Sequence, residues 1–232
     1  MLNLLRTEFY KLFHSLYFWR IGLFNLLLSS ILLLDSYKKT TSLFFASLYN
    51  TPLLYSLIIV FAALFVGNDF EQRTLCTYIS AGQKRSYVIF IKALVYQIAC
   101  FAILLIPLLI HGLLGFLFLK ETFVFTDNVF ITVIVIAISV LAMCMMPLLF
   151  SFIFRDIGIT LVVSMVIFFL MIFLMNGEWA WLITNILPMG QLRLVSLQQL
   201  SLNYVQFIVI DFLWILLLYW SSYAVFGCSD LR

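Results

Sequence analysis

Long apolar runs, separated by short polar segments, dominate the chain from about residue 17 onward. A helix needs about 20 apolar residues to cross the hydrocarbon core of a bilayer. Segments such as 98–110 and 131–141 are apolar on every face, whereas strands of a membrane barrel alternate apolar and polar residues. The pattern therefore predicts an all-α integral membrane protein with about six spans. We place the spans at 17–34, 51–67, 87–113, 129–153, 157–175 and 204–226.

A different pattern precedes the first span. In residues 2–16, leucine and phenylalanine recur at spacings of three and four, and polar side chains, among them Glu8 and Lys11, fill the remaining arc. A helix with basic residues beside its apolar stripe is typical of the membrane interface. We therefore predict an interfacial helix over 2–16. The alternative is a plain extension of the first span.

The segment 176–203, between the last two spans, is apolar but interrupted by glycine, proline and polar residues. Its tryptophans, Trp179 and Trp181, favour the interface between membrane and water. We predict short helices at the outer surface or a re-entrant element.

The composition supports a single membrane domain that covers 1–232. Apolar residues make up 65% of the chain and charged residues 10%, and the mean hydropathy is +1.17. A soluble domain is roughly half apolar and about a quarter charged. The formal net charge of +3 comes without a basic tract, so nucleic acid is not an expected partner.

Lysine and arginine positions predict the orientation, because cytoplasmic loops are enriched in both. With the N-terminus in the cytoplasm, the inner segments carry about twice as many of these residues as the outer ones. The inner set is Arg6, Lys11, Arg20, Arg73, Lys84, Arg85, Lys92, Arg155 and Arg232, and the outer set is Lys38, Lys39, Lys120 and Arg193. An even number of spans returns the C-terminus to the cytoplasm. We expect a multi-pass protein of the cell membrane.

The loop between the second and third spans, 67–86, has recognisable helix boundaries. Asn68 followed by Glu71 is close to a capping box, and Gly82 is placed to end a helix in a left-handed cap. We therefore predict a short helix over 69–80. It is either a solvated helix resting on lipid headgroups or a docking element for a cytoplasmic partner.

Few polar residues interrupt the spans. Asp211 lies about eight residues into the last span, and a carboxylate there is a functional hypothesis by default. It could meet substrate, pair with a cation or be protonated; alternatively, it bonds to a hydroxyl of a neighbouring helix or faces water of the outer loop. Asn25 gives the first span a mildly polar face. His111 is expected to be a packing or interface residue rather than a proton carrier.

Motifs of catalysis and nucleotide binding are missing from the sequence. It has no Gly-x-x-x-x-Gly-Lys-Ser/Thr phosphate loop, no His-Glu-x-x-His and no Gly-x-Ser-x-Gly. His14 and His111 are too far apart in sequence to predict a histidine-rich metal site. We therefore expect neither catalytic residues, nor a metal, nor a cofactor in this chain.

The loop 67–92 resembles the cytoplasmic loop of ABC transporter permeases, the class with about six spans that exports polysaccharides, drugs, antibiotics and peptides. The similarity rests on Gly67-Asn68-Asp69-Phe70-Glu71-x-x-Thr74-Leu75, followed by Ser80-Ala81-Gly82-x-x-Arg85-Ser86 and Lys92. The family often has Gly where this sequence has Arg73. The opening Glu8-Phe9-x-Lys11-Leu12 is also similar to the interfacial helix of that family, and the layout of the spans agrees over the whole chain.

The resemblance implies a permease subunit without an ATPase of its own. Such a subunit pairs with a second permease, identical or related, and with two ATP-binding subunits that hold ATP and Mg. The coupling helix that contacts the ATPase would comprise Asp69, Phe70, Glu71, Arg73, Thr74 and Leu75, and the helix with Glu8 and Lys11 would approach it too. The span with Asn25 would border the second permease and the translocation path.

The substrate class that the resemblance implies is amphipathic or antimicrobial peptides and related antibiotics. The alternative function is a secondary transporter or channel that needs no ATPase, although such proteins usually carry more charge inside the membrane. A membrane enzyme is disfavoured, because Asp211 alone supplies no paired catalytic groups.

Overall fold

The computed structural model describes residues 2–36, 40, 42–119, 129–178, 180–199 and 204–227. Regular structure in this part of the chain is helical throughout, as the sequence predicted. The elements are α1 (Leu2–His14), α2 (Leu16–Ser36), α3 (Leu43–Ala62), the π-helical turn η2 (Ala63–Gly67), α4 (Asn68–Glu71), α5 (Thr74–Ser80), α6 (Arg85–Phe118), α7 (Val129–Phe154), α8 (Ile157–Met175), α9 (Ala180–Ile186), α10 (Pro188–Ser196) and α11 (Tyr204–Gly227).

Within the described residues, six helices are long and apolar enough to cross a membrane, so the chain is a multi-pass membrane protein. The continuous helix Leu43–Glu71, made of α3, η2 and α4, forms the second span and begins eight residues before the predicted start. The early start is possible because polar side chains there find partners. Asn50 donates a hydrogen bond to Ser36, and Ser47 bonds to His111.

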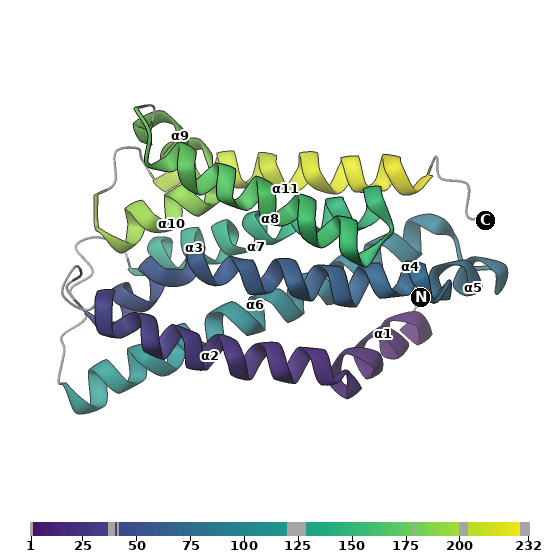
Figure 1. Cartoon of the computed structure of the whole chain (residues 1–232), viewed down its shortest axis with the longest axis horizontal. Coiled ribbons are helices and arrows are strands. Elements are labelled where there is room, and N and C mark those ends of the chain that lie inside the picture. Colours follow the sequence, from purple (N-terminus) through teal and green to yellow (C-terminus); the bar gives the residue numbers. More distant parts are fainter. Residues whose placement is uncertain are drawn as a thin grey trace.

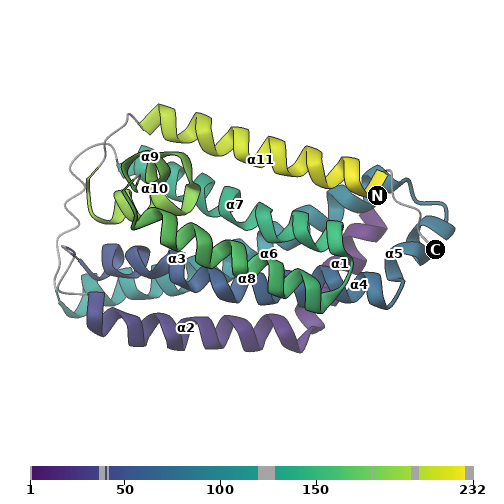
Figure 2. The same ribbon diagram turned by 45° about the horizontal axis from the view of Figure 1, so that its top comes forward.

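The long helices run side by side along the molecule in both Figure 1 and Figure 2. The helices α3, α6 and α7 form the core, with 50–61% of their most apolar windows buried, against 17% for α2, α8 and α11. The outer three helices therefore present their apolar side chains to the surroundings. We name the two ends of the bundle by their elements: the α1 end holds α1, α4 and α5, and the α9 end holds α9 and α10 (Figure 1).

The first helix is separate from the first span, which excludes the plain extension. α1 ends at His14, and the chain changes direction at Ser15 before α2 begins (Figure 1). Leu4 and Leu12 of α1 are buried, while Tyr10 and Phe13 are exposed. α1 is thus amphipathic and is packed on the end of α6. Its location at the membrane interface stays a prediction.

The segment 176–203 contains two short helices that differ in burial, and its location at the outer surface or as a re-entrant element stays a prediction. α9 exposes Trp181 and Leu182 at the surface. α10 is almost entirely buried and packs against α3 and α7. The two helices approach each other at Gly190, where an added Cβ would lie 2.4 Å from the Cα of Thr184. Trp179 and residues 200–203 of this segment lie outside the described residues.

Candidate functional site

The predicted continuous helix over 69–80 is wrong, because the chain turns sharply in its middle. α4 ends at Glu71 and α5 begins at Thr74, and between them Arg73 has left-handed backbone angles, with φ 55°. The predicted capping box is also absent. Asn68 continues the helix that arrives from α3, so no helix begins there and no N-cap is needed. The end of α5 is as predicted, with Gly82 at φ 85°.

The π-helical turn η2 lies directly before α4. A π-turn adds one residue to the helix and turns the side chains that follow by about 100° relative to an uninterrupted α-helix. Asp69, two residues after η2, points into the bundle between α1 and α6. Gly67, the last residue of η2, lies against the start of α8, where a Cβ would be 3.2 Å from Cγ1 of Ile157.

Four charged side chains meet at the α1 end of the bundle. The Lys92 ammonium lies 2.9 Å from Oε2 of Glu8 and is also paired with Asp69. Lys11 pairs with the other oxygen of Asp69. We call these residues, Glu8, Lys11, Asp69 and Lys92, the buried ionic cluster. Two carboxylates and two ammonium groups balance in charge, and they join α1, α4 and α6.

The cluster is closed to solvent except at one side chain. Glu8, Asp69 and Lys92 are at most 2% exposed, while the side chain of Lys11 is 31% exposed. The ammonium of Lys92 also lies 3.8 Å from the centre of the Phe65 ring, a cation–π contact that helps replace its lost hydration. Removing one member would leave an uncompensated charge in a dry site, which typically costs about 3–5 kcal/mol.

Two groups at the rim of the cluster have shifted pKa values. Burial, followed by repulsion from Lys92, lowers the pKa of Lys11 to about 8, and attraction to Glu8 opposes this only in part. Burial, followed by the negative charge of Glu8, raises the pKa of Tyr78 to about 12. Tyr78 on α5 therefore lies close to the cluster and stays a neutral phenol at physiological pH.

The next two residues of α4 contact other helices. The ring of Phe70 packs edge-on against Phe152 of α7, at 5.7 Å between centroids, and against Phe226 of α11, at 6.1 Å. The Glu71 carboxylate accepts a hydrogen bond of 3.3 Å from the backbone N–H of Ile157, in the first turn of α8, where the helix dipole favours an anion. Residues 69–71 thus contact five different helices.

The remaining residues of the predicted coupling helix divide into an inner and an outer set. The hydroxyl of Thr74 donates to the carbonyl of Asp69 at 3.2 Å, and Leu75 is buried. Arg73 is exposed, as are Gln72, Thr77 and Ser80. We call these four residues the outer face of α5, with Gln72 and Arg73 contributed by the turn that precedes the helix. Of the loop residues that the sequence assigned to a partner, Asp69 and Leu75 face inward and Arg73 faces outward.

The two polar residues predicted inside the membrane do not join the ionic cluster. Asn25 is buried and donates a hydrogen bond of 2.7 Å to the carbonyl of Ile103 on α6. Asp211 is buried and is hydrogen-bonded to the hydroxyl of Ser139 on α7. Each therefore links its own span to a neighbouring helix.

Sequence reasoning missed the central role of Lys92. It was counted among the residues that mark the cytoplasmic side and as the last residue of the loop motif, yet it lies inside α6 and is 1% exposed. A signal was present, because an ammonium within an apolar span requires a buried acidic partner. Glu8 and Asp69 are the acids that pair with Lys92, but both lie too far from it in sequence for the pairing to be predicted.

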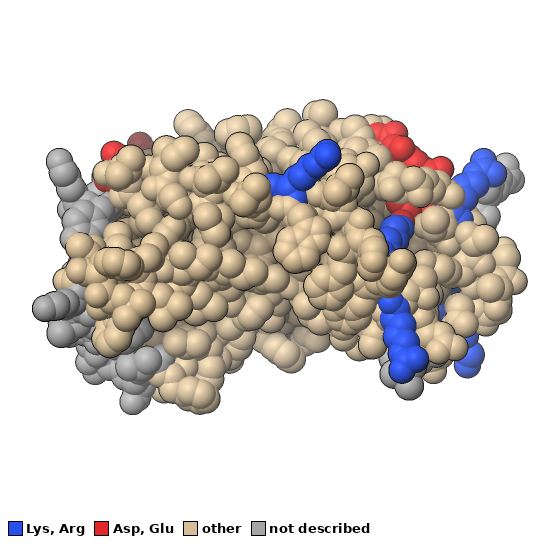
Figure 3. Space-filling model, turned by 90° about the horizontal axis from the view of Figure 1, so that it is seen from below, with Lys and Arg blue, Asp and Glu red and all other residues tan. Residues whose placement is uncertain are grey.

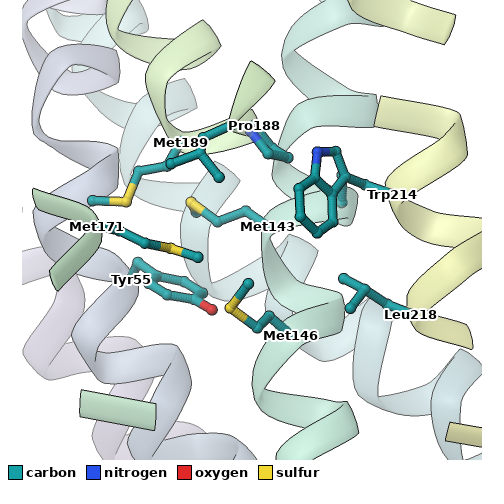
Figure 4. A pocket seen from close by; sticks show the side chains of 10 residues that line it. Tyr55, Met143, Met146, Met171, Pro188, Met189, Trp214 and Leu218 are labelled. Carbon is teal, nitrogen blue, oxygen red and sulfur yellow. The ribbon is translucent and has the colours of Figure 1, made fainter. Parts of the chain in front are cut away.

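Two of the spaces between the helices have apolar linings. A cavity of about 20 Å³ is lined by Tyr55, Trp214 and four methionines, and Figure 4 shows these side chains converging between α3, α7, α8, α10 and α11. It has room for about one water molecule, far below the size of a ligand site. An open groove of about 500 Å³ runs between α6, α7 and α11, with Gln97 as its polar lining residue beside Tyr219.

Charged side chains are concentrated at the α1 end. On the face seen in Figure 3, most blue and red atoms gather at the right, where Figure 1 places α1, α4 and α5, and the middle is mostly tan. At the α9 end, Arg193 is the only lysine or arginine among the described residues. These described residues contain no group of three or more His, Cys, Asp or Glu side chains suited to a metal ion.

Comparison with known proteins gives no relative: no family model matches the chain, and no curated protein matches it.

Proposed function

We propose that this multi-pass protein is the membrane-spanning subunit of an ATP-driven exporter of the ABC type, which works with a separate ATP-binding subunit. The observation that carries the proposal is the arrangement of α4 and α5. α5 and the turn before it expose an outer face of Gln72, Arg73, Thr77 and Ser80, while residues 69–71 of α4 are fastened to the spans.

This arrangement suits the transmission of force. A partner that binds the outer face of α5 and moves would pull on α4. Asp69 would carry the pull to α1 and α6, Phe70 to α7 and α11, and Glu71 to α8. Since charged and aromatic contacts fix α4 on several sides, α4 would move the spans with it instead of bending alone.

The proposal requires the α1 end to lie in the cytoplasm, where ATP is available. The distribution of basic residues supports this orientation, because the segments predicted to be inside carry nine lysines and arginines and the segments predicted to be outside carry four. A second permease, identical or related, would complete the translocation path. The groove between α6, α7 and α11 has the size and apolar lining that suit an amphipathic peptide or antibiotic.

The test is an affinity purification of the tagged protein from detergent-solubilised native membranes, followed by an ATPase assay. We expect an ATP-binding subunit to co-purify with the wild type. Negative charge on the outer face of α5, introduced by Arg73→Glu combined with Thr77→Glu, is expected to release that subunit and abolish the associated ATPase activity. Lys84→Glu is the matched control, because Lys84 is exposed at the same end but lies beyond α5.

Two results contradict the proposal. One is an intact wild-type protein that purifies without any ATPase. The other is equal loss of the subunit from the α5 variant and the Lys84 control. Either result would favour the alternative function, a secondary transporter or channel that needs no ATPase.

A further inference from the structure

Asp211 is an acidic residue buried inside the bundle. It lies on α11, is 0% exposed, and is hydrogen-bonded to the hydroxyl of Ser139 on α7. Its second oxygen, Oδ1, has no hydrogen-bond partner. An ionised carboxylate in such a site would keep a full negative charge with one donor, at a cost of several kcal/mol.

The hydrogen bonds around Ser139 favour a protonated, neutral Asp211 side chain. The amide nitrogen of Gln191 on α10 donates to the carbonyl of Asn185 at 3.0 Å, so the Gln191 oxygen is the atom 3.5 Å from Ser139 Oγ. That oxygen and the Asp211 carboxylate both accept hydrogen bonds, but Ser139 has one hydroxyl hydrogen. A proton on Asp211 resolves the conflict: Asp211 donates to Ser139, Ser139 donates to Gln191, and Gln191 donates to Asn185.

The cations on the helices packed against α11 are occupied elsewhere in the described structure. Lys92 of α6 belongs to the buried ionic cluster, and His111 bonds to Ser30 and Ser47. Arg85 donates to the carbonyl of Gly227, and Arg193 of α10 bonds to Asn176. The other titratable groups of these helices are Tyr87, Tyr96 and Cys100 on α6, Cys144 on α7, and Tyr204, Tyr219 and Tyr223 on α11 itself. None of these groups is bonded to Asp211.

We propose that Asp211 is a proton-binding site inside the membrane, and that its proton holds α10 and α11 against α7. The ligand is the proton itself, bound as the O–H of a neutral carboxylic acid. It completes a chain of donors from α11 through α7 to α10 and on to α9. This site goes beyond the proposed coupling to an ATPase, since it lies on other residues and needs no partner.

The bound proton links the packing of α10 to pH. When α10 separates from α7 and water reaches Asp211, the O–H bond breaks, the proton passes to water, and a hydrated carboxylate remains. Proton loss therefore accompanies opening. Because the packed state holds one more proton than the open state, raising the pH favours opening.

Infrared spectroscopy of the purified full-length protein in lipid vesicles tests the site. Near neutral pH, we expect a C=O stretching band of a protonated carboxyl group that is absent from Asp211→Asn. Ser139→Ala removes the acceptor of the Asp211 proton, and we expect it to shift this band to higher frequency. If no protonated carboxyl band responds to either substitution, Asp211 is ionised and the proposal is overturned.

Thermal unfolding in detergent gives a second, independent readout. Asn at position 211 mimics the neutral acid, because its amide still donates to Ser139. Asp211→Asn should therefore unfold near the wild-type temperature at neutral pH. Raising the pH should lower the unfolding temperature of the wild type more than that of the variant. Equal alkaline losses in the two proteins would refute a bound proton. Loss of ATPase co-purification would leave this result unaffected, so the two proposals fail separately.

Discussion

The ammonium nitrogen of Lys92 lies 2.9 Å from Oε2 of Glu8, although 84 positions separate the two residues in the chain. This contact fastens the amphipathic helix α1 to the core span α6. Asp69 joins the same lysine, so the contact also fixes the turn between α3 and α6. The amphipathic helix α1 and the loop with the most distinctive sequence therefore both contact a single buried side chain.

Substitution of Lys92 by Met should destabilise the protein strongly. It leaves two buried carboxylates with only Lys11 as a cation, and breaking a buried pair costs about 3–5 kcal/mol. Thermal unfolding in detergent measures the effect. The double variant Glu8→Gln with Lys92→Met should recover part of the loss, because Asp69 and Lys11 then balance each other. A Lys92→Met variant as stable as the exposed control Lys84→Met would contradict the ionic cluster.

Lys11 should give the folded protein a distinctive pH dependence. In the folded state its pKa is about 8, whereas an ordinary lysine has 10.5. Between these values the unfolded chain binds more protons than the folded chain, so the contribution of Lys11 to stability rises with pH. The free energy of unfolding of the wild type, relative to Lys11→Gln, should increase through this window. A constant or falling difference would show that the pKa of Lys11 is not lowered.

Replacing Arg73 by Gly should stabilise the protein. Left-handed backbone angles cost an L-amino acid roughly 1–2 kcal/mol, and Gly avoids this cost while gaining some freedom in the unfolded state. We expect a net gain of about 1 kcal/mol in the free energy of unfolding. Gly82→Ala is the reciprocal control, because Gly82 has φ 85° and should lose stability. A destabilised Arg73→Gly variant would argue against the break between α4 and α5.

Gly190→Ala should disrupt the packing of α9 on α10. The new Cβ would lie 2.4 Å from Thr184 Cα and 2.5 Å from its carbonyl oxygen, and both are backbone atoms that cannot move aside locally. We expect a loss of about 3 kcal/mol or more, the upper range for overpacked sites. The control is Gly22→Ala, where the added Cβ meets nothing within 4 Å. Similar unfolding temperatures for the two variants would contradict the close approach.

Hydrophobic patterning predicted the membrane helices well, because length and apolar content alone decide whether a helix can span a bilayer. The predicted span 157–175 coincides with α8. The start of the second span was missed for a physical reason. Ser47 and Asn50 read as loop residues, but the polar partners that satisfy them come from α6 and α2.

The site was harder to predict, since its geometry depends on contacts across the bundle. The sequence singled out Asp69 and the loop around it. The neighbouring residues in the sequence do not reveal that η2 turns Asp69 inward or that Asp69 pairs there with Lys92. The left-handed turn is a partial exception. The resemblance placed a Gly where this chain has Arg73, and a Gly at that position suits positive φ.

The most direct test of the proposed coupling is site-specific photo-cross-linking in the native cells. A photoreactive amino acid is placed at Thr77, on the outer face of α5, and in a second strain at Trp181, exposed at the α9 end. Coupling predicts that Thr77, but not Trp181, cross-links to a protein that binds and hydrolyses ATP. Cross-linking to such a protein from Trp181 alone would contradict both the orientation and the proposed function. Cross-linking from neither position would contradict the proposed function.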